Sequence, residues 1–321
     1  MWDPSIGLGT VSHQTIGYVW PMGPWYWAFD RLGVPDWVAQ RLWLGTLLFA
    51  AGTGVLWLLR RVLGWATAPA VAAAFVYACT PYLLTLAARL SVILLPWAGL
   101  PWLIGLAALS VRVRSWRYPA LFALVVATVG SVNATALVLV AIGPLLWLVH
   151  ARLEGEASTA VVLRAVGRIG VLTVAANLWW IAGLWAQGGY GIEILRYTET
   201  AEVVASASVA VEVLRGLGYW FFYGGDRLGP WIEPGSDYTQ RLPLLSLTYA
   251  LPFGAFVAGA FVRWRDRVFF VALAVVGTLA SVGAHPWNRP PPAGRVVRAV
   301  LESDVGLAMR SLPRAAPLVA L

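Results

Sequence analysis

Long apolar segments recur along the whole chain, and they constrain its fold more than any other feature. They cover roughly residues 38–59, 67–87, 92–111, 119–131, 134–149, 169–186, 242–262 and 268–284, and a ninth begins near residue 313. A helix needs about 20 apolar residues to cross a bilayer. The chain is 60% hydrophobic and 12% charged, which leaves too little polar surface to enclose a core in water. We therefore predict an all-α, polytopic membrane protein with about eight transmembrane segments and a truncated ninth.

Two of these segments, 119–131 and 134–149, are short for a crossing. They could form a re-entrant pair, or two short tilted spans joined at residues 131–133.

The arginines predict the orientation of the chain. All 23 basic residues are arginine. Eleven of them lie with three acids at every second boundary, a net charge of +8, in the ranges 60–61, 112–117, 152–168 and 263–267. Because positive charge in short loops stays cytoplasmic, the segments expected to face outward are residues 1–37, 88–91, 132–133, 187–241 and 285–312. The arginines are dispersed and no nucleic-acid-binding motif accompanies them, so we expect no nucleic-acid partner.

The first outer segment is dense in Trp, Gly and Pro, with a few hydrogen-bonding side chains among the aromatic ones. It reads either as an interfacial aromatic belt, where Trp and Tyr lie at headgroup level, or as the wall of a binding site. In the outer segment 187–241, apolar positions at helical spacing predict a helix over residues 193–217. An aromatic, turn-rich loop follows it.

Few side chains suggest chemistry on their own. Arg89 lies in a short outer loop, against the orientation rule, and could either extend to the membrane surface or bind a phosphate bidentately. Arg41, in the first apolar segment, is similar. Glu199 and Glu202 are spaced i, i+3 and are either surface acids or contacts for a sugar hydroxyl. The three histidines are far apart and no zinc-ligand spacing exists, so we expect no metal site and no cofactor, and a divalent cation is not indicated.

Several stretches resemble one known family, and they keep its order along nearly the whole chain. They are WDP (2–4), HQTIGY (13–18), PMGP (21–24), WVAQRLW (37–43), RLSVILLPWAGLPW (89–102), VNATA (132–136) and EVLRGLGYW (212–220). These stretches resemble the N-terminal membrane domain of the actinobacterial α-(1→3)-arabinofuranosyltransferase family, which builds cell-wall arabinan.

The resemblance implies a GT-C-type glycosyltransferase in the plasma membrane with its active face outward. It implies decaprenyl-phosphoryl arabinofuranose as donor, a growing arabinan chain as acceptor, and contact with membrane lipid. It also implies that a first span and an acidic motif precede Trp2, so that the chain is a partial domain and the catalytic base lies upstream of Met1.

The resemblance also suggests roles within the chain. Arg89 and Arg41 would bind the donor phosphate and stabilise the charge of the leaving group. Glu199 would be the sugar-contacting acid of a covering loop at 187–241, and it is the candidate within the chain for a catalytic base. The sugar pocket would be lined by His13, Gln14, Tyr18 and Trp20.

Two other function classes stay open at this stage. One is a non-catalytic membrane partner that binds a polyprenyl lipid. The other is a transporter, although paired repeats and polar residues at mid-membrane, which many transporters have, are not evident.

Overall fold

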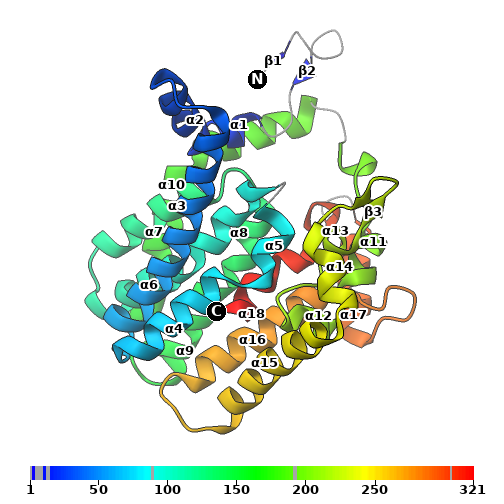
Figure 1. Cartoon of the computed structure of the whole chain (residues 1–321). Coiled ribbons are helices and arrows are strands. Elements are labelled where there is room, and N and C mark those ends of the chain that lie inside the picture. Colours follow the sequence, from blue (N-terminus) through cyan, green and yellow to red (C-terminus); the bar gives the residue numbers. More distant parts are fainter. Residues whose placement is uncertain (1, 4–9, 12–14, 88–89, 191–193, 304–305) are drawn as a thin grey trace.

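The computed structural model describes residues 2–3, 10–11, 15–87, 90–190, 194–303 and 306–321, which form a bundle of helices (Figure 1). The longer helices are α2 (Met22–Arg31), α3 (Asp36–Trp57), α4 (Thr67–Ala78), α6 (Leu94–Val113), α7 (Arg117–Val129), α9 (Ile142–Leu153), α10 (Thr159–Tyr190), α15 (Leu242–Phe261), α16 (Arg267–Val282) and α17 (Pro292–Leu301). The shorter ones are α1 (Thr15–Tyr18), α5 (Pro81–Ala87), α8 (Ala134–Val140), α11 (Ala201–Ala207), α12 (Ala210–Leu214), α13 (Trp220–Tyr223), α14 (Glu233–Gln240) and α18 (Ala316–Ala320).

Single helical turns and four two-residue strands complete the described chain. The turns are η1 (Leu58–Val62), η2 (Ser91–Ile93), η3 (Ile194–Tyr197), η4 (Gly306–Met309) and η5 (Leu312–Ala315). The strands pair antiparallel as β1 (Trp2–Asp3) with β2 (Thr10–Val11), and β3 (Gly225–Asp226) with β4 (Gly229–Pro230). The all-α prediction is confirmed.

Six helical stretches, two of them made of two consecutive α-helices, are long and apolar enough to cross a membrane among the residues described. They are Asp36–Val62, Thr67–Ala87, Ser91–Val113, Ala134–Leu153, Thr159–Gly189 and Leu242–Phe261. The expected spans near 119–131 and 268–284 correspond to the shorter apolar helices α7 and α16. Every expected segment is therefore helical, while the count of eight crossings and a ninth stays a prediction.

Helix α6 lies at the centre of the bundle, and 83% of its most apolar stretch is buried. It packs on α3, α7 and α9. Close approach to α3 depends on Gly105, where an added Cβ would lie 2.2 Å from the Trp57 ring. Trp57 stacks on Trp102 with ring centroids 5.1 Å apart. Small residues allow helix backbones to approach in this way within membranes.

The arginine-rich boundaries lie together at one end of the bundle. Arg112 pairs with Glu156 at 3.1 Å and donates to the Val62 carbonyl at 2.6 Å. Trp65 Nε1 donates to Asp266 Oδ2 at 3.3 Å. These bonds join the boundaries 112–117, 152–168 and 263–267 with residues 62 and 65, beside the fourth boundary at 60–61, so the charge pattern grouped them correctly on one side.

The segments predicted to face outward are likewise bonded to one another. Ser131 Oγ, in the turn after α7, donates to the Trp20 carbonyl at 2.7 Å. Thr135 Oγ1 donates to the Ala308 carbonyl at 2.8 Å. The His285 ring lies 2.8 Å from the carbonyl of residue 205. In Figure 1 the N-terminal segment (dark blue) lies at the top of the bundle, and α11, α13, α14 and α17 cluster at the right of the bundle, lower down.

The predicted helix over 193–217 is wrong, and Glu193 itself lies outside the described residues. Helix α10 runs on to Tyr190, and η3, α11 and α12 follow as separate pieces. The Thr200 side chain starts α11 by accepting from the Val203 amide at 3.2 Å. Ser208 ends α11, because its hydroxyl binds the Val204 carbonyl at 2.8 Å. Local side-chain-to-backbone bonds of this kind compete with a continuous helix.

Candidate functional site

The N-terminal aromatic segment is fixed to the turn after α7. Ser131 Oγ donates to the carbonyls of Gly17 (3.0 Å) and Trp20 (2.7 Å). The contact requires glycine, because a Cβ on Gly17 would lie 2.3 Å from the Ser131 carbonyl oxygen. Trp20 Nε1 donates to Thr128 Oγ1 at 3.4 Å. The sequence-predicted pocket residues Tyr18 and Trp20 are both exposed here.

His13 and Gln14, the other two residues predicted to line the sugar pocket, lie outside the described residues. So does Arg89, one of the two arginines predicted to bind phosphate.

A chain of polar contacts joins the segment to the connection between α5 and α6. Tyr26 donates to Gln40 Oε1 at 2.5 Å, and Gln40 Nε2 lies 3.4 Å from Ser91 Oγ. Burial raises the pKa of Tyr26. Neither Tyr26 nor Gln40 was singled out from the sequence, although both fall in stretches that carry the resemblance or adjoin it.

Arg41, the other arginine predicted to bind phosphate, stacks on a tryptophan of its own helix. Its guanidinium lies 4.7 Å from the Trp37 ring centroid and Nη1 donates to the Trp37 carbonyl at 3.4 Å. The side chain is exposed. The i, i+4 spacing on α3 explains this stacking, which directs the guanidinium along the surface of its own helix.

Glu199 joins two outer segments. Its carboxylate accepts from Ser311 Oγ at 3.1 Å and lies 3.6 Å from Arg310, whose Nε also donates to the Glu199 carbonyl at 2.7 Å. Arg310 is buried and also binds the Thr198 hydroxyl. The contacts of Glu199 are those of an anchor between the loop before α11 and the turn before η5.

Glu212 is the centre of the largest polar network on this side. Arg215 Nη1 donates to both Glu212 carboxylate oxygens, at 2.8 and 3.0 Å, and is itself buried. Tyr223 donates to Glu212 Oε2 at 2.6 Å, and Tyr249 donates to Oε1. Burial raises the pKa of Glu212, but the tyrosine hydrogen bonds and Arg215 outweigh it, so the pKa is lowered.

The network also reaches α14 and α15. Arg215 Nη2 donates to the Tyr238 carbonyl at 2.9 Å and to Thr248 Oγ1 at 2.8 Å. Burial, and then the neighbouring Glu212 carboxylate, raise the pKa of Tyr223. The Glu212–Arg215 spacing of i, i+3 on a helix was the sequence signal that could have identified the pair.

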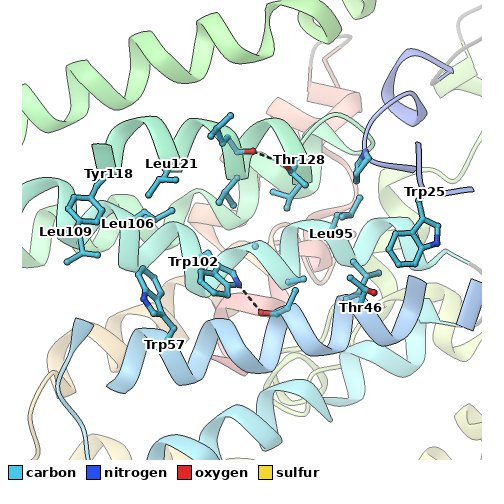
Figure 2. Close-up of a pocket in the computed structure, with 18 of the residues that line it drawn as sticks. Trp25, Thr46, Trp57, Leu95, Trp102, Leu106, Leu109, Tyr118, Leu121 and Thr128 are labelled. Atoms are coloured by element: carbon cyan, nitrogen blue, oxygen red, sulfur yellow. Dashed lines mark hydrogen bonds between the residues drawn. The ribbon is translucent and has the colours of Figure 1, made fainter. Parts of the chain in front are cut away.

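An apolar groove of about 730 Å³ lies between α3, α6 and α7 (Figure 2). Trp25 and Thr128 lie at one end, beside the N-terminal segment, and Tyr118 and Leu109 lie at the other. Trp102 Nε1 in the groove is already satisfied by the Ala50 carbonyl at 2.9 Å. The volume lies within the range of ligand pockets, roughly 300–1,000 Å³, and the apolar lining suits a hydrocarbon chain.

Within the described part of the chain, no group of three His, Cys, Asp or Glu side chains is arranged to hold a metal ion. Glu212 and Glu199, two acids in a segment predicted to face outward, are each paired with an arginine.

The family model described as "Alpha-(1->3)-arabinofuranosyltransferase, N-terminal GT-C domain" matches residues 1–321. A relative from Mycobacterium tuberculosis (strain ATCC 25618 / H37Rv) and one from Mycolicibacterium smegmatis (strain ATCC 700084 / mc(2)155) are both named alpha-(1->3)-arabinofuranosyltransferase. Each is 26% identical over 100% of this chain. The chain spans 22% of the length of these curated relatives.

Two cryo-EM structures of the arabinofuranosyltransferase AftD from mycobacteria have a similar fold. One has a TM-score of 0.52 at 26% identity and covers 91% of this chain and 25% of that chain. The other has a TM-score of 0.55 at 22% identity and covers 100% of this chain and 22% of that chain.

The family match extends over the whole chain, and it agrees with the helical membrane fold and with the resemblance seen in the sequence. The chain belongs to the family of α-(1→3)-arabinofuranosyltransferase N-terminal GT-C domains.

Proposed function

We propose that this chain forms membrane-embedded machinery that transfers arabinofuranose from a polyprenyl-phosphate donor to an arabinan acceptor. The donor is decaprenyl-phosphoryl arabinofuranose, and the reaction takes place at the outer face of the plasma membrane. The observation that carries the proposal is the juxtaposition of an apolar groove with a polar, aromatic layer. One end of the groove lies at Trp25 and Thr128, where the N-terminal segment is bonded to the bundle.

The groove suits the prenyl chain of such a donor. Its lining comes from three membrane-embedded helices and has few polar atoms free to bind water. Leu124, on its rim, is 60% exposed, so the groove borders the lipid phase. A prenyl chain entering from the bilayer would leave its phosphate and sugar at the outer end.

The sugar would then lie beside the N-terminal segment. The exposed Trp20 ring offers an aromatic face, and the Tyr26–Gln40 pair offers a hydroxyl and an amide for sugar hydroxyls. The acceptor would approach over the segment 194–240, which lies on the same side of the bundle.

The transfer reaction requires a leaving group, a general base and positive charge near the phosphate. The bond between the anomeric carbon and the phosphate oxygen breaks, and a glycosidic bond to the acceptor hydroxyl forms. Polyprenyl phosphate leaves, and a general base takes the proton of the acceptor hydroxyl. Positive charge near the phosphate would stabilise the leaving group.

Filling the groove tests the proposal. Thr46→Trp, on the groove side of α3, should raise the apparent KM for the lipid-linked donor and lower transfer to an arabinan oligosaccharide in proteoliposomes, read by mass spectrometry. Leu42→Trp, one turn away and outside the groove lining, is the matched control and should transfer normally.

Equal donor KM in the two variants would contradict the groove assignment. Prenyl-lipid binding without transfer, by the 321-residue chain and by any longer protein that contains it, would favour a non-catalytic lipid-binding role.

A further inference from the structure

Arg314 differs from the other arginines in the interior of the outer layer. It lies in η5, half-buried, and its Nη1 donates to Asn133 Oδ1 at 3.2 Å. Its Nε is buried without a hydrogen-bond partner. Within the described residues no carboxylate forms an ion pair with it, whereas buried Arg215 and Arg310 each have a glutamate.

A guanidinium Nε withdrawn from water without a hydrogen-bond partner is costly, and buried polar and charged groups are normally paired. The fold nevertheless holds Arg314 in place, because η5 packs against α8 and α16. An arrangement of this kind indicates an anion that the protein binds from outside.

The surroundings of Arg314 are rich in hydrogen-bond donors. The Tyr82 hydroxyl lies within Coulombic range of both Arg314 and Tyr219. Tyr82 and Tyr219 are 3% and 6% exposed. One turn along α5 from Tyr82, Thr85 Oγ1 is buried and has no partner. A guanidinium with a tyrosine hydroxyl as its electrostatic neighbour is well matched to phosphate oxygens, which are acceptors only.

The position of Arg314 relates this cluster to the groove. Its partner Asn133 lies two residues after Ser131, which binds the Trp20 carbonyl. Thr128, at the outer end of the groove, binds the Trp20 indole. The turn from residue 128 to residue 133 therefore has the groove end on one side and Arg314 on the other.

We propose that Arg314, oriented by Asn133 and flanked by Tyr82, binds the phosphate group of the lipid-linked donor. The inference rests on the proposed function, and it deepens it by naming a phosphate-binding residue other than the arginines expected from the sequence. The guanidinium stabilises the polyprenyl phosphate as it leaves.

The binding test uses farnesyl phosphate and farnesol as probes on the purified, detergent-solubilised protein, with intrinsic tryptophan fluorescence as readout. The wild-type protein should bind farnesyl phosphate at least tenfold more tightly than farnesol. Arg314→Gln should abolish that preference, and Arg314→Lys should retain part of it as a point charge. Arg298→Gln is the control, because Arg298 is on the same side but pairs with Glu302 at 2.8 Å.

Asn133→Asp tests the same inference without changing Arg314, so the test does not depend on the arginine variants folding correctly. The new carboxylate can still accept from the Ala136 amide, as Asn133 does at 2.8 Å. It would also give Arg314 a resident counter-ion. Thermal stability should therefore be unchanged or higher, while the preference for farnesyl phosphate is lost. A stable Asn133→Asp protein that keeps the wild-type preference would overturn the inference.

Phosphatidylglycerol micelles, added as a competitor, test whether Arg314 binds the phosphate of the donor or the phosphate of a lipid headgroup. Competition equal to that of farnesyl phosphate would reject the donor assignment.

The transfer assay separates the proposed function from the proposed role of Arg314. If the wild type transfers arabinofuranose and the donor KM is unchanged in Arg314→Gln and Asn133→Asp, the phosphate-binding role of Arg314 is refuted. The proposed function then still stands. Absence of transfer by the chain and by any longer protein that contains it, with phosphate preference intact and dependent on Arg314, would refute the function alone.

Discussion

Glu212 and Arg215 should be the most sensitive polar pair in the outer layer. Arg215 is 2% exposed and has both Glu212 oxygens, the Tyr238 carbonyl and Thr248 Oγ1 as partners. The Glu212 carboxylate accepts four hydrogen bonds, two from Arg215 and one each from Tyr223 and Tyr249. Glu212→Gln removes the negative charge and leaves the amide oxygen as the one acceptor. Removal of one partner of a buried ion pair costs about 3–5 kcal/mol. Because glutamine keeps the shape of the side chain, we expect a loss of about 3 kcal/mol in the free energy of unfolding.

The assay is denaturant unfolding in mixed micelles, followed by fluorescence. Glu202→Gln is the control, since Glu202 is exposed on α11, and it should change stability by less than about 0.5 kcal/mol. Arg215→Met combined with Glu212→Gln should cost less than the sum of the single changes, with a coupling of about 1–3 kcal/mol. A Glu212→Gln protein as stable as Glu202→Gln, or strictly additive single changes, would refute the reasoning.

Three further outcomes follow from the structure. Burial raises the pKa of Glu212, but hydrogen bonds and Arg215 lower it overall; its stabilisation is therefore present above the unfolded pKa of about 4.3 and lost as pH falls through the folded value. Acid titration of unfolding should show this loss in the wild type and not in Glu212→Gln. Gly17→Ala should release the N-terminal segment and speed tryptic cleavage at Arg31, whereas Gly45→Ala, with open space around its Cβ, should not. Arg310→Gln should raise amide hydrogen exchange in residues 198–207 by about tenfold or more, and unchanged exchange would contradict the anchoring role.

The membrane helices were predictable because one physical requirement dominates them. A backbone in lipid must satisfy its own hydrogen bonds, so apolar stretches of sufficient length become helices whatever their neighbours are. Every expected apolar segment is helical, and α3 and α15 follow the expected ranges closely. The arginine pattern also grouped boundaries that the structure joins, as Arg112 and Glu156 show.

The outer segments were harder to predict because local polar side chains decide their backbone. The helix expected over 193–217 is interrupted where Thr200 and Ser208 bind nearby backbone groups. Apolar periodicity alone does not weigh such caps against a continuous helix.

The candidate site depended almost wholly on tertiary contacts. Glu199 meets Arg310 and Asn133 meets Arg314 across 111 and 181 residues of chain. A single sequence contains no signal for such pairs, so the sequence assigned Arg314 no role and did not identify Arg310 as the partner of Glu199. Arg41 shows the converse, because its Trp37 partner is only four residues away.

The sequence by itself determined the membrane location, the helical class, the grouping of loops on two sides and the family. These depend on composition and spacing, which act over one helix length. Only the tertiary structure decided that Arg215 and Arg310 each meet a glutamate and that Arg314 has no carboxylate partner among the described residues. That outcome depends on how η5 packs against α8 and how the outer loops are anchored. Burial and pairing of charges belong to the packed molecule, and they are decided only when distant segments meet.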